Sequence, residues 1–262
     1  MISAMTQELI FLEKDRHIGW LTLNRPERKN ALNCAMWQAI PALVAAAEDD
    51  PEIRILILRS STPNIFCAGA DISEFDLLIR DRQARDENRR AIRAACSALE
   101  NFTKPTIAMI GGACVGGGCI LALCCDLRFG DVKSRYGITP AKLGLVYGLS
   151  DTRRLMDQVG AAAARDILFS ARLVTAEKAL HMGLVNEIYP AAALAAEVRA
   201  YVDILLGNSP HSLRQIKQII RRVQDGSRDD DAASERVFMD AFDGSDHRQG
   251  VTAFLNKRKP EY

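Results

Sequence analysis

The sequence predicts an α/β fold, in which a core that mixes strands and helices is followed by a helical C-terminal part. Two nearly continuous apolar runs, Ile53–Leu58 and Thr106–Ile110, are typical of strands buried on both faces of a sheet. The second run leads through a glycine-rich loop into an apolar helix and a short strand at Leu127–Phe129, which is the order of a β-α-β unit. Beyond Gly137 the apolar spacing is almost entirely helical.

The first half of the chain is expected to open with a β-hairpin. Its two apolar runs span Leu9–Leu23 and flank Asp15-Arg16. Asn33 is then expected to cap an amphipathic helix that carries Met36, Trp37, Ile40, Leu43 and Val44 on one face. A longer surface helix is expected at Arg82–Phe102, because its charged and apolar residues separate onto opposite faces.

The second half contains one expected strand, Val185–Ile188, among several helices. The helical segments are Thr152–Val159, Ala162–Phe169, Thr175–Met182, Ala192–Leu206, Ser212–Val223 and Ser234–Asp243. We therefore expect a mixed core at residues 1–190 and a helical region at residues 191–262.

Composition argues against several classes of protein. The 262 residues carry a net charge of +1, with 34 Lys+Arg against 33 Asp+Glu, so no global field attracts nucleic acid or an anionic membrane. No apolar stretch approaches the roughly 18 residues of a membrane span, and Met1–Glu8 lacks the parts of a signal peptide. From these two absences we expect a cytoplasmic location. The seven cysteines form no C-x-x-C pair and have no nearby histidine, so we expect reduced, buried thiols and no metal site.

The glycine triplet Gly116–Gly118 has two interpretations that the residues alone leave open. Three successive glycines are expected where the backbone needs unusual dihedral angles, or where a ligand must approach it closely. The triplet is either a tight strand-to-helix turn or the site of an anion at a helix N-terminus. It fits neither a P-loop nor a dinucleotide-binding motif, and the chain has no G-x-S-x-G or H-E-x-x-H motif.

Two segments together resemble the enoyl-CoA hydratase/isomerase (crotonase) superfamily: Phe66-Cys67-Ala68-Gly69-Ala70-Asp71-Ile72, and Gly111 to Cys119 with its glycine triplet. Weaker matches extend over nearly the whole chain: Leu23-Asn24-Arg25-Pro26, Asn30-Ala31-Leu32-Asn33, Ala176-Glu177-Lys178-Ala179, Gly183-Leu184-Val185 and Phe254 to Pro260. The resemblance implies a ClpP/crotonase-like fold of repeated ββα units, with C-terminal helices that build a homotrimer or a dimer of trimers.

The resemblance also implies an acyl-CoA thioester as substrate, with no further cofactor. In this superfamily two backbone N–H groups hold the thioester oxygen as it becomes an enolate, and by position these would be the N–H groups of Ala70 and Gly117. Coenzyme A would lie against Ala68, Asp71 and Ile72, with its phosphates near Arg25, Arg28 and Lys29. Phe254 and Lys257 would complete the nucleotide site, either from the same chain or from a neighbouring subunit. The Lys257–Lys259 charges are equally compatible with a solvated surface.

The catalytic acids of the superfamily are missing from their expected positions. Ile120 and Pro140 stand where a hydratase carries its two glutamates, and Gly148 stands where some members carry an aspartate. Neither an isoleucine nor a proline can transfer a proton. Tyr147 matches a tyrosine of the methylmalonyl-CoA decarboxylases. In this chain Tyr147 either acts on the substrate or packs at the pocket edge. The acids Asp71, Glu74 and Asp76 are expected to cap helices or lie at the surface.

A lyase of the decarboxylase type is therefore favoured over hydration, because losing CO2 from a malonyl-type thioester needs an oxyanion hole but no base. Two alternatives remain: a hydratase or isomerase with a non-standard acid or base, and a non-catalytic acyl-CoA-binding protein. All three predict binding of a CoA thioester.

Overall fold

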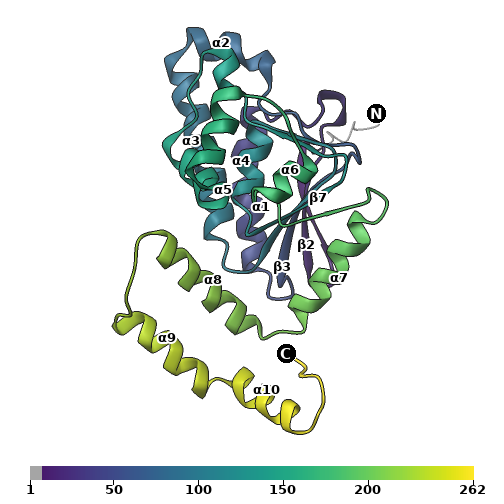
Figure 1. Ribbon diagram of the computed structural model, residues 1–262, viewed down its shortest axis with the longest axis vertical. Helices are drawn as coiled ribbons and strands as arrows, with labels where there is room; N and C mark the ends of the chain where they lie inside the picture. Colours follow the sequence, from purple (N-terminus) through teal and green to yellow (C-terminus); the bar gives the residue numbers. More distant parts are fainter. Residues whose placement is uncertain (1–7) are drawn as a thin grey trace, which may run out of the picture. The chain divides into compact units, whose positions relative to one another are not determined.

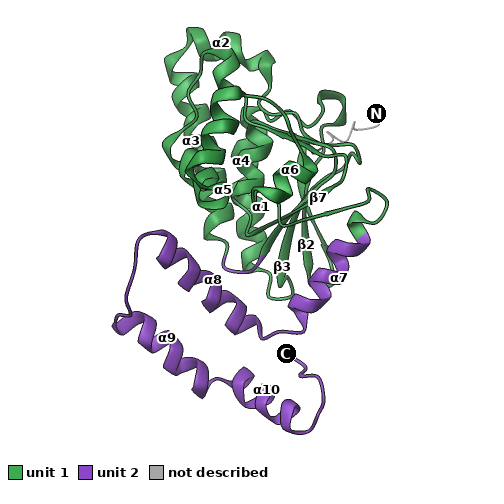
Figure 2. Ribbon diagram, viewed as in Figure 1, with its two compact units in different colours: residues 1–102, 106–195 green, residues 103–105, 196–262 purple. Residues whose placement is uncertain are grey.

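The computed structural model describes residues 8–262, which divide into two compact units (Figures 1 and 2). The first unit comprises the chain up to Phe102 together with Thr106–Ala195, and the second comprises Thr103–Pro105 and Ala196–Tyr262. The sequence predicts a single division after residue 190. Residues 1–7, on which the signal-peptide argument rests, lie outside the described part.

Two sheets frame the first unit. The larger has six strands in the order β1-β2-β3-β5-β7-β10, and the smaller has four in the order β4-β6-β8-β9. The strands are β1 (Ile10–Asp15), β2 (Ile18–Leu23), β3 (Ile55–Ser60), β4 (Ile65–Cys67), β5 (Thr106–Ile110), β6 (Ala113–Val115), β7 (Leu127–Asp131), β8 (Arg135–Gly137), β9 (Val174–Thr175) and β10 (Glu187–Tyr189).

A ββα unit is repeated along the chain. The successive strand pairs β3-β4, β5-β6 and β7-β8 each place their first strand in the larger sheet and their second in the smaller one. Within each sheet these strands pair in parallel, and a helical segment follows each pair. The repeat implied by the resemblance is therefore confirmed. Its consequence is that the ends of β4 and β6 lie side by side, although they are far apart in sequence.

The helices of the first unit are α1 (Cys34–Asp49), α2 (Phe75–Arg80), α3 (Arg82–Asn101), α4 (Gly117–Leu123), α5 (Leu149–Ser170) and α6 (Ala176–His181). Short 3-10 helices occur at η1 (Pro26–Arg28), η2 (Ile72–Glu74) and η3 (Pro140–Leu143). The helix α7 (Leu194–Leu206) leads into the second unit, which continues with α8 (Pro210–Gln224), α9 (Ala232–Asp243) and α10 (Ser245–Leu255). No helix within residues 8–262 has the length and apolar composition needed to cross a bilayer.

The core confirms most of the long predicted elements. The hairpin forms as β1 and β2, and the Asn33 side chain accepts a hydrogen bond from the Met36 N–H at 2.9 Å as the cap of α1. The buried face of α1 includes Trp37 and packs against α3. The two helices expected at 152–159 and 162–169 are one helix, α5, interrupted at Gly160, whose φ of 72° is not helical. The short strands β4, β6, β8 and β9 were not predicted.

Candidate functional site

The backbone at Ala70 presents an N–H group that the sheet does not use. Leu32 pairs with Ala70 through a parallel bridge, in which the Leu32 N–H donates to Gly69 O at 2.7 Å and the Asp71 N–H donates to Leu32 O at 2.9 Å. In this pattern the N–H of the bridged residue points away from its partner strand. Ala70 is exposed, and among the described residues its N–H donates no backbone hydrogen bond.

The glycine triplet approaches this segment because its residues have no side chains. Gly116 adopts φ 51° and ψ −112°, a combination that strains any residue with a β-carbon. A β-carbon on Gly118 would lie only 2.6 Å from Cys67 Cβ. A β-carbon on Gly117 would lie 3.7 Å from the carbonyl carbon of Gly69, the atom bonded to the Ala70 nitrogen. The triplet therefore serves a strained turn and a close approach at once.

Gly117 begins α4, so its N–H has no acceptor within the helix. The neighbouring Gly116 N–H is used, since it donates to Gly137 O at 2.8 Å, whereas the described residues provide no backbone acceptor for Gly117. Two unused N–H groups, at Ala70 and Gly117, thus belong to backbone segments in contact. An oxygen that gathers negative charge is the natural acceptor for such a pair.

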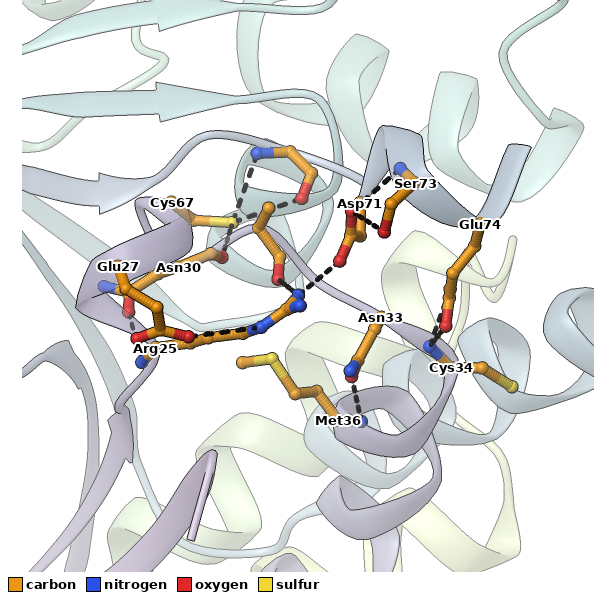
Figure 3. A network of polar contacts seen from close by, with 12 residues as sticks. Arg25, Glu27, Asn30, Asn33, Cys34, Met36, Cys67, Asp71, Ser73 and Glu74 are labelled. Atoms are coloured by element: carbon orange, nitrogen blue, oxygen red, sulfur yellow. Dashed lines mark hydrogen bonds and ion pairs between the residues drawn. The ribbon is translucent and has the colours of Figure 1, made fainter. Parts of the chain in front are cut away.

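The loop that carries Ala70 is held by a polar network around Arg25 (Figure 3). The Arg25 guanidinium donates through Nη1 to Asp71 Oδ2 at 2.5 Å and to Ala31 O at 3.0 Å. The Ser73 hydroxyl donates to Asp71 Oδ1 at 2.7 Å. The Ser73 hydrogen bond, followed by the Arg25 contact, lowers the pKa of Asp71 to about 2 in spite of its burial.

Asn30 anchors the other side of this loop, a role that the sequence patterns do not predict. It is fully buried with φ 53°, and its amide donates to Ser60 Oγ at 2.7 Å and to Phe66 O at 3.1 Å. Its side-chain oxygen accepts from the Arg25 N–H at 2.8 Å. An asparagine that tolerates a left-handed conformation just before a predicted helix is the signal that could have revealed this role.

The remaining residues expected to contact coenzyme A lie in two places. Arg28, Lys29, Ala68 and Ile72 are exposed on the loops around Arg25 and Asp71, and the Ala68 N–H is already bonded to Lys29 O at 3.0 Å. Phe254 and Lys257 belong to the second unit. There Phe254 is 81% exposed and lines a cavity of about 520 Å³.

The three acids Asp71, Glu74 and Asp76 have the structural roles expected of them. Asp71 caps η2, and the Glu74 carboxylate accepts from the Cys34 N–H at the start of α1. Asp76 pairs with Arg80 at 3.0 Å on an exposed helix face. These contacts leave all three engaged in capping or surface pairing.

The positions that lack acids in the sequence lie near α4 and α5. Ile120 is partly buried in α4 and packs against the core, Pro140 begins η3, and Gly148 caps α5. Beside Gly148, the Tyr147 side chain turns inward: its hydroxyl is buried and has no hydrogen-bond partner among residues 8–262. Burial, followed by the nearby Cys119 and Asp151, raises the pKa of Tyr147 well above its usual value. Substrate can reach this hydroxyl only if the segment that carries it moves.

All seven cysteines are free, and six of them are buried. The Sγ atoms of Cys114 and Cys119 lie 3.8 Å apart, and burial raises the pKa of Cys67 to about 12. Raised pKa values make thiols poor nucleophiles and poor metal ligands at neutral pH. Within the described part of the chain, no group of three or more His, Cys, Asp or Glu side chains could hold a metal ion.

Comparisons with known proteins agree with this geometry. A family model described as Enoyl-CoA hydratase/isomerase matches residues 13–262. A curated relative, Crotonyl-CoA hydratase of Syntrophomonas wolfei, is 33% identical over 98% of this chain and 99% of its own length. Short-chain-enoyl-CoA hydratase of Clostridium acetobutylicum is 32% identical over 96% of each chain. A solved structure from Hyphomonas neptunium, described under the enoyl-CoA hydratase/isomerase family, superposes with a TM-score of 0.94 at 38% identity and covers 97% of both chains.

Proposed function

The chain belongs to the enoyl-CoA hydratase/isomerase family of acyl-CoA-processing enzymes, and from this premise we propose that it stabilises a thioester enolate between the N–H groups of Ala70 and Gly117. The observation that carries the proposal is that these two N–H groups donate no backbone hydrogen bond among residues 8–262 and belong to backbone segments in contact. A preorganised donor of this kind is worth about 3 kcal/mol in a transition state, because it needs no reorganisation as charge develops.

We favour a lyase reaction, the loss of CO2 from a malonyl-type CoA thioester. The bond between the α-carbon and the carboxylate carbon breaks, CO2 leaves, and the electron pair becomes the enolate held by the two N–H groups. This step needs no carboxylate base, and Ile120 and Pro140 supply none. In the proposal Tyr147 orients the departing carboxylate once its segment admits the substrate.

Coenzyme A would lie along the loops that carry Ala68, Asp71 and Ile72. Arg28 and Lys29 are exposed cations on the adjoining loop, which suits them to phosphate groups. Arg25 is committed to Asp71 and Ala31, so its part in binding is to hold the loop in shape. In the proposal, Phe254 and Lys257 of a neighbouring subunit complete the nucleotide site.

Hydration is the second candidate, because the curated relatives named above are called hydratases. It requires an acid or base outside the two usual positions. A non-catalytic acyl-CoA-binding role is the third candidate, and it would follow from the same replacements at residues 120 and 140.

The proposal includes a homotrimer or a dimer of trimers in the cytoplasm. The second unit exposes apolar side chains that a folded chain normally covers, namely Ile216, Ile220, Val223, Phe238, Met239, Phe242, Phe254 and Leu255. The seven free cysteines suit a reducing compartment. Light scattering of the purified protein tests the assembly, and cell fractionation tests the location.

The reaction is tested by incubating the protein with enoyl-, β-hydroxyacyl- and malonyl-type CoA esters and recording each mass change. Loss of CO2 from a malonyl ester supports the lyase, and gain of water by an enoyl ester overturns it in favour of hydration. Binding of CoA esters without any mass change supports the non-catalytic alternative. Absence of both binding and turnover overturns the proposal as a whole.

A further inference from the structure

A carboxylate fills the space beside Gly148, although residue 148 itself has no side chain. A β-carbon added to Gly148 would lie 3.0 Å from Asp151 Oδ2. Gly148 has φ −63° and ψ 154°, ordinary extended backbone that any residue adopts, so the glycine is not required by its dihedral angles. Because residue 148 has no side chain, there is room beside it for Asp151 Oδ2.

The Asp151 carboxylate is held in place by its other oxygen. Asp151 Oδ1 accepts from Arg154 Nη1 at 2.6 Å, and the same guanidinium binds Glu100 through two hydrogen bonds of 2.7 Å. The side chains of Asp151, Arg154 and Glu100 are 17%, 10% and 20% exposed. Arg154 is therefore shared between two carboxylates. Of the two Asp151 carboxylate oxygens, Oδ1 accepts the hydrogen bond from Arg154.

This cluster lies next to the helix that begins with Gly117. The helices α4 and α5 pack against each other, and Asp151 is in the first turn of α5. The buried Tyr147 hydroxyl, which has no partner among the described residues, lies near both Asp151 on α5 and Cys119 on α4. An unsatisfied buried hydroxyl is costly and is typical of a site that another molecule completes.

We propose that Asp151 is the general acid of this enzyme and protonates the α-carbon of the enolate held by Ala70 and Gly117. The proposal rests on the proposed function. After CO2 leaves, the enolate electron pair takes the proton of the Asp151 carboxylic acid, the C–H bond forms, and the carboxylate is reprotonated by water. Burial raises the pKa of Asp151 against the opposing effect of Arg154, which favours the protonated form that this step needs.

The charged and titratable groups around Asp151 come from three helices and one loop. They are Arg153 and Arg154 on α5, Glu100 and Cys96 on α3, Cys119 on α4 with Cys124 at its C-cap, and Tyr147 in the loop before α5. Because the acid form reacts, kcat is expected to fall as pH rises through the Asp151 pKa, and this limb of the pH profile is absent once residue 151 cannot titrate.

The test uses the full-length protein with the malonyl-type ester that the wild type decarboxylates. Asp151→Asn is expected to lower kcat by about 10²-fold or more with little change in KM, as for other general acids. Asp157→Asn is the matched control, because Asp157 lies on the same helix and pairs with the exposed Arg153 at 3.2 Å. Its kcat is expected to equal that of the wild type.

Two further variants keep the test decisive if Asp151→Asn folds poorly. Gly148→Ala leaves every charge in place but occupies the space of Asp151 Oδ2, so it is expected to lower kcat as well. The double change Gly148→Asp with Asp151→Asn returns a carboxylate to this space and is expected to recover activity and the pH limb.

If the wild type decarboxylates the ester and Asp151→Asn is equally active, the general-acid role of Asp151 is overturned, whereas the proposed function stands. A wild type that converts no CoA ester overturns both. A slow Asp151→Asn variant that keeps the wild-type pH profile shows a structural contribution and overturns the general-acid role.

Discussion

The Arg25 guanidinium and the Asp71 carboxylate meet at 2.5 Å and join two loops that are separated by 46 residues in the sequence. One loop leads into α1, and the other carries Ala70. Asp71 is buried, and Arg25 and Ser73 both donate hydrogen bonds to its carboxylate. Because Asp71 directly follows Ala70, these bonds hold the Ala70 N–H in position. A contact of this kind links the stability of the protein to the geometry of its proposed oxyanion hole.

Removing this carboxylate is expected to destabilise the protein. Asp71→Asn should lower the free energy of unfolding at pH 7 by about 1–3 kcal/mol, because Arg25 loses its charged acceptor in a buried place. Arg80→Ala is the control, since it removes an exposed ion pair worth less than about 1 kcal/mol. Denaturant unfolding of both variants measures the difference, and equal effects would contradict the prediction.

The same carboxylate predicts a pH dependence of stability. Its folded-state pKa of about 2 lies below the ordinary value of 3.8, so the unfolded chain binds the proton more tightly. The stabilising contribution is therefore complete above about pH 4 and is lost as pH falls towards about 2. Denaturant unfolding at a series of pH values should show the free energy of unfolding of the wild type falling more steeply in this window. The free energy of unfolding of Asp71→Asn should lack this additional fall.

The proposed oxyanion hole predicts a selective loss of turnover when one N–H is removed. Ala70→Pro deletes the N–H that the described backbone does not use, so kcat should fall by about 10²–10³-fold. Binding of a CoA ester, measured by calorimetry, should change little. Ala70→Ser keeps the N–H and should remain active. Wild-type turnover in the proline variant would show that Ala70 is not a donor.

Tyr147→Phe is expected to move stability and activity in opposite directions. The hydroxyl is buried without a partner among residues 8–262, so its removal should raise the free energy of unfolding by about 1 kcal/mol. If the hydroxyl orients the substrate as proposed, kcat should fall while CoA-ester binding persists. Thermal unfolding and steady-state kinetics separate the two effects. An unchanged kcat would reduce Tyr147 to a packing role.

Gly116→Ala is expected to cost about 1–3 kcal/mol of stability, because φ 51° with ψ −112° is strained for alanine. Gly144→Ala is the matched control: Gly144 has φ 69° and ψ 17°, ordinary left-handed backbone, with no atom within 4 Å of an added β-carbon. The control should lose roughly 1 kcal/mol, as expected for a non-glycine residue in this region. Denaturant unfolding decides whether Gly116 carries the larger strain.

The sequence by itself determined the long elements and the family. The apolar run Thr106–Ile110 is β5 with the same bounds, and Asn33 caps α1 as its position predicts, because periodicity and capping are local properties of the chain. The motifs around Ala70 and Gly117 carried the resemblance that the family comparison confirms. They did so because a turn that only glycine can adopt requires glycine at fixed positions in the sequence.

Only the tertiary structure decided how these pieces meet. The strands β4, β6 and β8 are three residues each, too short for a periodic pattern, and they form because the ββα repeat supplies neighbouring strands to pair with. Likewise, the bond between Arg25 and Asp71 and the position of Asp151 beside Gly148 depend on chain segments brought together by folding. The absence of a carboxylate at residues 120, 140 and 148 can be read from the sequence. The position of the Asp151 carboxylate beside Gly148 cannot, because it depends on the direction of a side chain in three dimensions.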